Sequence, residues 1–218
     1  MDAARWTEWL AGWNRELLAA HVPGVRDAFL DPAVTPAVLA SGWLGAPGAT
    51  DDALRALEAR LGVALPPSYR AFLQASDGFL QPGMIVPRLL RAGEVQWYRA
   101  AHEDLIDAWG SGAGDDDPVA PALAASLQVS AEERVGTAVY LLDPRAVGPD
   151  GEWEALLFAH WVPGVERHAS FAALMASERA ARAAPPPPPP PSGWRAALDV
   201  LRWIFRPERA QGIDDRRA

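Results

Sequence analysis

The chain has 218 residues, half of them apolar and 22% charged, so it can bury the core of one domain and is too hydrophobic to be wholly disordered. Its 28 acidic and 20 basic residues give a net charge of −8, which argues against a protein that coats nucleic acid. The absence of cysteine excludes disulfides and thiolate chemistry, and the absence of lysine excludes Schiff bases and a P-loop lysine. We find neither a signal-peptide pattern nor an apolar run near ~18 residues, so we expect a cytoplasmic protein.

Seven consecutive prolines, residues 185–191, divide the chain. Such a run forms an extended helix with a rise of ~3.1 Å per residue, so it is a stiff spacer that joins no packed core. Residues 1–184 carry 14 arginines and 24 acids, whereas residues 192–218 carry six arginines and four acids, so the charge changes sign across the spacer. The predicted parts are an N-terminal segment (1–48), a main domain (49–184), the spacer (185–192) and a tail (193–218).

The first predicted element is a helix over residues 2–20. Apolar side chains recur in it at helical spacing and form one stripe: Trp6, Trp9, Leu10, Trp13 and Leu17. A stripe with three tryptophans has two interpretations, a surface for a partner or a face that packs on the protein's own body, and packing is the more frequent. Residues 23–48 are rich in Pro, Gly and Ala, and we expect them to be irregular apart from one short helix.

Two helices with a tight turn between them are predicted next. The first has Thr50 as its cap, an acidic first turn, an apolar face and Gly62 as a left-handed stop. Its apolar face consists of Leu54, Leu57 and Leu61. The second begins at the prolines of Leu65-Pro66-Pro67-Ser68 and ends at Asp77-Gly78.

The rest of the main domain alternates helices and strands. In chain order, the pattern predicts a strand over 84–86, a helix over 94–109, a loop over 110–121, strands over 135–142, 152–161 and 165–168, and a helix over 171–183 capped by Ser170. The strand over 152–161 is expected to be the longest, and its face with Trp153, Ala155 and Leu157 is expected to contact helices. This order predicts an α+β fold, with a mostly antiparallel sheet of three to five strands packed against helices.

Residues 61–79, LGVALPPSYRAFLQASDGF, resemble the hallmark of the SUKH (Smi/Knr-like) superfamily. That hallmark is a helix with a glutamate, here Glu58, followed by a Leu-Gly step, Leu-Pro, Tyr, Phe-Leu and an Asn-Gly or Asp-Gly end. Later stretches are also similar, so the resemblance spans about residues 49–175, and Asp77 stands where asparagine is commoner. We assign structural roles to the motif residues Glu58, Leu65, Pro66, Tyr69, Phe72, Leu73 and Gly78.

The resemblance implies an α+β domain used for protein recognition. Bacterial relatives commonly act as immunity proteins that bind and neutralise a cognate toxin, and fungal relatives regulate cell-wall synthesis and signalling. We therefore predict an immunity protein whose groove beside the sheet covers a toxin's active site. The alternative is a regulatory or scaffold adaptor tethered through its C-terminal helix.

Catalytic and metal sites find little support. The histidine and acids within residues 102–107 include adjacent positions that do not share one face of a helix. His160 and His168 flank a predicted turn without a third ligand for zinc. The glycines of residues 110–114 follow a helix and lack the P-loop pattern, so a flexible linker is expected. We therefore expect no catalysis, no cofactor and no metal.

The predicted partner surface is acidic. An acidic loop at Asp115–Asp117 has two interpretations, a solvated loop that maintains solubility or a surface that attracts a basic, nuclease-like toxin. Steering of this kind raises association rates by roughly 10–1000-fold. The residues predicted to bind a protein partner are Glu94, Trp97, Tyr98, Asp115, Asp116, Asp117, Glu152 and Glu154.

The tail predicts a basic amphipathic helix over residues 194–209. Four arginines, Arg195, Arg202, Arg206 and Arg209, fall on one face, and apolar side chains fall on the other. Such a helix suits an anionic membrane surface, a partner's groove, or docking on the acidic main domain, and the sequence leaves these alternatives open.

Overall fold

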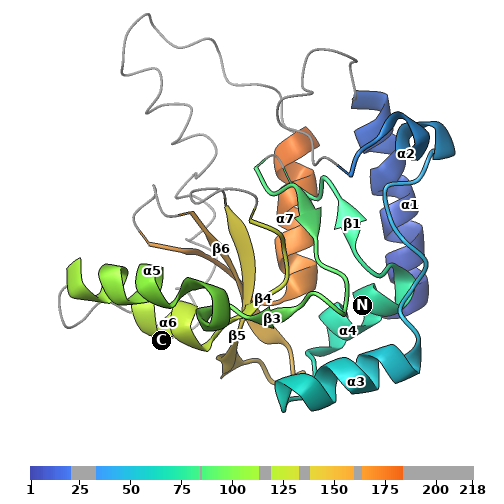
Figure 1. The fold of residues 1–218 in the computed structure, drawn as a ribbon. Helices are drawn as coiled ribbons and strands as arrows, with labels where there is room; N and C mark the ends of the chain where they lie inside the picture. The colour runs from blue at the N-terminus through green and yellow to red at the C-terminus, as the bar shows by residue number, and fades with distance from the viewer. Residues whose placement is uncertain (21–32, 84, 113–118, 133–137, 160–163, 184–218) are drawn as a thin grey trace, which may run out of the picture.

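The computed structural model describes residues 1–20, 33–83, 85–112, 119–132, 138–159 and 164–183 (Figure 1). The helices are α1 (Ala3–Ala20), α2 (Pro36–Ser41), α3 (Asp51–Leu61), α4 (Pro67–Ala75), α5 (Arg99–Gly112), α6 (Val119–Ala125) and α7 (Phe171–Ala183). The strands are β1 (Phe79–Leu80), β2 (Arg88–Leu89), β3 (Gln96–Trp97), β4 (Leu127–Gln128), β5 (Val139–Val147), β6 (Trp153–Phe158) and β7 (Glu166–His168). The predicted spacer and tail helix lie outside the described residues, as do Asp115–Asp117.

The central sheet has five strands in the order β3-β4-β5-β6-β7, and every neighbouring pair is antiparallel. A second, two-stranded antiparallel sheet is formed by β1 and β2, which lie between α7 and α1 in Figure 1. The predicted α+β fold with a mostly antiparallel sheet is therefore confirmed.

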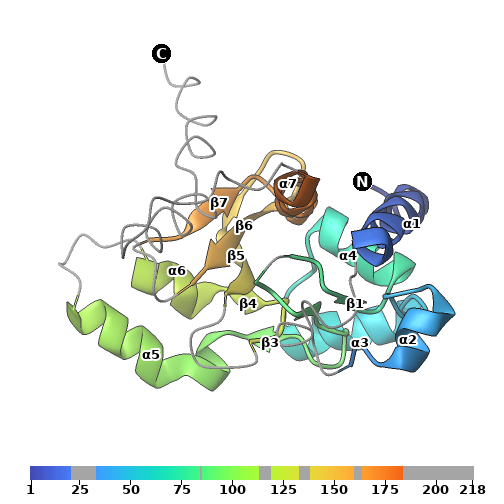
Figure 2. The same cartoon turned by 90° about the horizontal axis from the view of Figure 1, so that it is seen from above.

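Helices cover both faces of the central sheet (Figure 2). On one face, Trp153, Ala155 and Leu157 of β6 join a core that also contains residues of α1, α3, α4 and α7. On the other face, Leu156 and Phe158 join a smaller core with residues of α5 and α6. The face of β6 expected to contact helices does so, and its other face is also covered by helices.

The tryptophan stripe of α1 packs on the protein's own body. Trp6, Leu10, Trp13 and Leu17 are at most 5% exposed, and the Trp6 indole Nε1 donates a hydrogen bond to the Ser68 carbonyl at 2.8 Å. Helix α1 therefore belongs to the same core as α4 and α7, although the sequence placed it in a separate segment.

The turn between α3 and α4 is fixed by the motif that the sequence singled out. Thr50 Oγ1 caps α3 by accepting from the Ala53 amide, and Gly62 adopts φ +74° after its last turn. The Glu58 carboxylate accepts a hydrogen bond from the Leu65 amide at 3.1 Å, which closes the turn. Because Tyr69, Phe72 and Leu73 of α4 are fully buried, this turn sets the position of the main core.

Two predictions for residues 81–109 were wrong. A strand was expected over 84–86, but the described residues 85–86 are not in a strand. The strands of this region are β1, which precedes them, and β2, which follows them. Residues 96–97 form strand β3 rather than the start of a helix, and α5 begins only at Arg99. Val95 and Tyr98 are three residues apart, which is also the spacing of one helix face, and this spacing led to the prediction. Both side chains are buried, but neither residue is helical.

Two further predictions placed element ends incorrectly. Within the loop predicted over 110–121, residues 110–112 continue α5 and residues 119–121 begin α6, so part of the expected glycine linker is helical. Strand β5 continues through Pro144 to Val147 by an irregularity in its pairing with β6, and it is longer than β6. Proline interrupted the sequence pattern there, but it is tolerated where ladder pairing is irregular.

Candidate functional site

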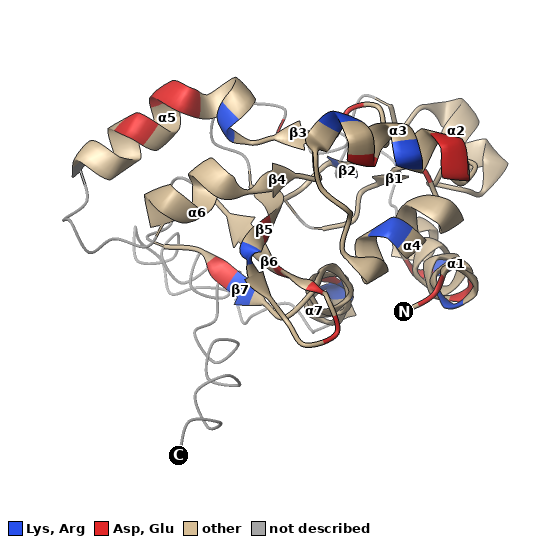
Figure 3. Ribbon diagram, turned by 90° about the horizontal axis from the view of Figure 1, so that it is seen from below, with Lys and Arg blue, Asp and Glu red and all other residues tan. Residues whose placement is uncertain are grey.

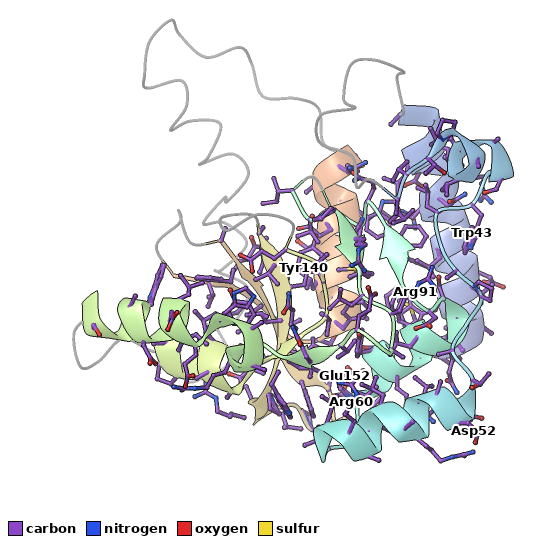
Figure 4. The ribbon with its side chains drawn as sticks, in the orientation of Figure 1. Trp43, Asp52, Arg60, Arg91, Tyr140 and Glu152 are labelled. Atoms are coloured by element: carbon purple, nitrogen blue, oxygen red, sulfur yellow. The ribbon has the colours of Figure 1, made fainter. Side chains whose placement is uncertain are left out.

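A hollow of about 750 Å³ lies between the segment that follows α2 and the small sheet β1–β2; we call it the hairpin groove. Residues 41–46 form one wall, residues 77–80 form the floor, and residues 88–94 form the opposite wall. Trp43 and Arg91 of the two walls lie on the side of the molecule built from α1 to α4 (Figure 4). The groove therefore joins the motif segment around Gly78 to a wall that sequence reasoning left irregular.

Backbone and buried side chains hold the first wall in place. The Leu80 amide donates to the Leu44 carbonyl at 2.9 Å, which adds the wall to the edge of β1. Asn14, buried on α1, donates from Nδ2 to the Gly42 carbonyl at 2.7 Å and accepts from the Leu44 amide at 2.9 Å. These contacts fix the wall in the unbound protein, so the groove is preformed.

Trp43 is the aromatic side chain of this wall. Its ring packs edge-on against Phe79 of β1 with 5.9 Å between ring centroids. The indole is only partly buried and also lines the groove. A ring with one side on the core and another facing a hollow is suited to contact an apolar side chain of a partner.

Most charged groups of the groove are engaged within the protein. Glu94 Oε2 accepts from the Arg88 guanidinium at 2.8 Å and from the Arg91 amide at 2.9 Å. Burial opposes ionisation, but these hydrogen bonds and the two positive charges hold the pKa of Glu94 below its usual range. Asp77 Oδ1 accepts from the Ala92 amide at 2.7 Å.

Arg91 differs from these groups. Its guanidinium forms no ion pair with any residue that the structure describes, although its charge acts on Glu94. Its aliphatic stem lies against Gly78, where an added Cβ would be 3.1 Å from Arg91 Cγ. Gly78 also has φ +92°, so this motif glycine serves both the turn and the close approach of the arginine.

The residues predicted to bind a partner do not form one surface in the described part of the chain. Glu94 lines the hairpin groove, and Trp97 is partly buried on β3. Tyr98 is fully buried in the smaller core, where burial raises its pKa. Glu154 is an ion-pair partner of Arg167 on the neighbouring strand β7.

Glu152 has a structural position. It is 8% exposed, and its two carboxylate oxygens accept from the Ser68 amide at 2.8 Å and the Ser68 hydroxyl at 2.7 Å. Helix α4 has no side-chain hydrogen bond from its own N-cap residue, Pro66, so Glu152 supplies the missing acceptor from 84 residues away. A carboxylate at this end of a helix also complements the helix dipole.

Three acids of α5 are exposed, and we call this stretch of the helix the α5 acidic face: Glu103, Asp104 and Asp107. Glu103 and Asp107, one turn apart, both pair with the Arg99 guanidinium, at 3.3 Å and 3.2 Å, whereas Asp104 has no ion pair among the described residues. Figure 3 shows red segments along the outer side of this helix. The adjacent His102 stacks on Tyr98 with 4.2 Å between centroids, and its Nε2 lies 3.2 Å from Glu132 Oε2. The residues described by the structure contain no group of three or more histidines and carboxylates arranged to hold a metal ion.

Sequence reasoning missed three groove residues: Trp43, Arg88 and Arg91. They lie in segments without regular periodicity, so no stripe marked them. A lone tryptophan in a segment rich in glycine and proline was the available signal, because a large aromatic side chain there needs a specific packing site.

Comparison with protein-family models finds a match to the SMI1/KNR4 family (SUKH-1) over residues 48–163, which is more than half of the chain. The match confirms the resemblance seen in residues 61–79. It includes the floor and the second wall of the hairpin groove, whereas Trp43 lies just before it. No curated protein matches the chain. None of the described helices is both long enough and apolar enough to cross a membrane.

Proposed function

Because the chain belongs to the SMI1/KNR4 (SUKH-1) family, we propose that it is a non-catalytic protein-binding domain that acts as an immunity protein by neutralising a cognate toxin. The observation that carries this proposal is the preformed hairpin groove, which presents a partly buried tryptophan and an exposed arginine that has no ion pair within the described part of the chain. A preformed concave site binds without the cost of ordering its own walls.

Neutralisation follows from coverage of the toxin's active site. The partner inserts a segment into the hairpin groove, and the surrounding surface excludes substrate. A toxin that acts on nucleic acid is basic because it holds phosphates, so an acidic protein attracts it over long range. The exposed acids of the α5 acidic face contribute to this attraction, and the acids Asp115–Asp117 follow α5 in the chain. The expected cytoplasmic location stays a prediction.

The experiment is co-expression with the products of the neighbouring genes. Cells that express a toxic neighbour should grow only when this chain is present, and the two proteins should co-purify. Trp43→Ala should weaken protection, whereas Trp109→Ala on α5, also partly buried but outside the groove, should leave binding unchanged. If no neighbouring product is toxic and the partners belong to signalling or cell-envelope systems, the regulatory adaptor replaces the immunity proposal.

Long-range attraction is tested separately. Replacing Glu103, Asp104 and Asp107 by their amides should lower the association rate and its salt dependence, and should leave the dissociation rate nearly unchanged. Asp115–Asp117→Asn tests the adjacent acidic loop in the same assay. Asp52→Asn on α3 is the matched control, because Asp52 is an exposed acid on a different helix. Unchanged association rates in both sets of variants would refute steering.

A further inference from the structure

We propose that the hairpin groove selects a partner segment in which an acidic side chain stands next to a large apolar one. Arg91 is the receptor for the carboxylate, and Trp43 is the contact for the apolar side chain. This inference rests on the proposed function and adds the chemistry of the segment that the toxin inserts.

The first step is to ask which charged side chains of the groove already have partners within the protein. Four charged side chains line it: Asp77, Arg88, Arg91 and Glu94. Asp77 accepts a backbone amide, and Arg88 and Glu94 form an ion pair with each other. The donors of the Arg91 guanidinium remain available among the described residues. A carboxylate can accept two of them in parallel, whereas a basic side chain would meet like charge.

The second step is the position of Arg91. Its side-chain Cγ lies against Gly78 of the floor, and its backbone amide donates a hydrogen bond to Glu94 of the wall. The backbone and the first part of the side chain are therefore held in place. Side-chain ordering therefore costs less on binding than it would for a freely rotating surface arginine. The residue is exposed, so the guanidinium is accessible to a partner in the groove.

The third step is the apolar contact. Trp43 lines the wall that faces residues 88–94, and Leu80 of the floor is also partly exposed to the groove. An apolar side chain placed there loses contact with water on the indole and on the leucine at once. The four charges of the groove sum to zero, but Asp77 already accepts a backbone amide and Arg88 pairs with Glu94, so Arg91 is the cation left for a partner. Together with the apolar surface, it matches a segment with one acid and one large apolar residue.

The alternative occupant is the chain's own tail. Residues 193–218 place two acids beside large apolar residues, Leu198-Asp199 and Ile213-Asp214, but six arginines against four acids make the tail basic, and Arg91 disfavours a segment whose net charge is positive. Competition by a tail peptide, described below, separates this occupant from a partner segment. The overall acidity of the protein does not contradict an acidic anchor in the partner, because the two act at different ranges. The summed field attracts a basic protein over about a Debye length, ~8 Å at physiological salt, whereas Arg91 acts at hydrogen-bond distance.

The experiment is selection of a phage-displayed library of random twelve-residue peptides on the full-length protein. Wild type should enrich peptides with Asp or Glu beside Phe, Leu, Ile or Trp, and Arg91→Glu should change the preference to Lys or Arg. For an enriched peptide, fluorescence anisotropy should show ~10–100-fold weaker binding to Arg91→Ala, since the lost bond involves two charged groups. Arg55→Ala, an exposed arginine on α3 outside the groove, should bind like wild type.

Three results would overturn the inference. Wild type could enrich basic peptides, Arg91→Glu could retain the acidic motif, or a synthetic peptide of residues 193–218 could compete in an Arg91-dependent manner. The proposed function fails separately. If Trp43→Ala abolishes toxin neutralisation while Arg91→Glu retains it, the groove is the toxin site and only the acidic-anchor inference falls.

Discussion

The position of Glu152 leads to a prediction that separates a structural acid from a binding acid. Ser68 is fully buried, and both of its donors, the amide and the hydroxyl, are satisfied by the Glu152 carboxylate. Glu152→Ala removes both acceptors and leaves the two donors without partners at the start of α4. The hydroxyl can rotate to another acceptor, but the amide is fixed by the helix.

The expected loss of unfolding free energy is about 3–4 kcal/mol. Hydrogen bonds to a charged group contribute ~1.5–3 kcal/mol, and a buried donor left unpaired costs ~1–3 kcal/mol, but these effects overlap and do not add in full. Glu152→Gln keeps one acceptor for the Ser68 amide and adds a donor for the hydroxyl oxygen, so its loss should be about 1 kcal/mol. Since domains are stable by ~5–15 kcal/mol, the alanine variant should remain folded but weakened.

Urea unfolding followed by circular dichroism at pH 7 measures these values. With a slope of ~2 kcal/mol per molar urea, Glu152→Ala should lower the midpoint by ~1.5–2 M. Glu154→Ala, two residues along β6, is the control, and loss of its ion pair with Arg167 should cost ~0–1 kcal/mol. The reasoning is refuted if the unfolding free energy of Glu152→Ala lies within ~0.5 kcal/mol of the wild-type value, which is the usual effect of a surface substitution. It is also refuted if Glu152→Gln keeps its stability but loses partner binding.

Three further predictions concern the core and its titration. Trp6→Ala should cost ~3–5 kcal/mol in urea unfolding, and a chain without residues 1–20 should lack a cooperative thermal transition, because α1 is part of the main core. Gly83→Ala should cost ~1–3 kcal/mol, because its Cβ would overlap the Tyr140 hydroxyl. Burial lowers the pKa of His102, so near and below about pH 6.5 the unfolded chain binds more protons than the folded one, and the free energy of unfolding should fall as the pH falls. In urea unfolding between about pH 5 and 7.5, His102→Gln should reduce this dependence of stability on pH.

The elements that sequence predicted well carry their own signals. Helices α1, α3, α4 and α7 combine an apolar stripe with a cap or stop inside the same segment, as Thr50 and Gly62 do for α3. Ser170 Oγ likewise accepts from the Ala173 amide at the start of α7. Because these signals are local, the element ends agree with the prediction within one or two residues.

The elements that sequence missed are defined by distant partners. Strands β1 to β4 have two residues each, too few to show alternation, and they exist because of pairing such as Gln96 with Gln128. Helix α6 contains Pro121 and small residues, which imitate a loop, but Leu123 is fully buried against the sheet. Tertiary contacts therefore override weak local preference in these segments.

The candidate site was harder to predict for the same reason. Glu94 was singled out because of its charge, but Trp43 and Arg91 come together only when the segment after α2 joins the edge of β1. For Glu152, one signal existed: α4 begins at Pro66-Pro67-Ser68 without an internal cap, so its amides require an acceptor from elsewhere.

Acids in this domain repeatedly serve backbone amides. Glu58 accepts from Leu65, Asp77 from Ala92, Glu94 from Arg91 and Glu152 from Ser68. A count of acids in the sequence therefore overstates how many carboxylates are free to meet a partner, because these four have a fixed role in turns and helix starts. Among the described residues, the α5 acidic face has three exposed carboxylates against one arginine, Arg99, which pairs with Glu103 and Asp107, so this stretch keeps a net negative charge. Steering of a basic partner should therefore depend on α5 rather than on the end of β6. We therefore propose that association begins over α5 and that specificity is decided in the hairpin groove, by the contacts of Arg91 and Trp43 with the segment that the partner presents.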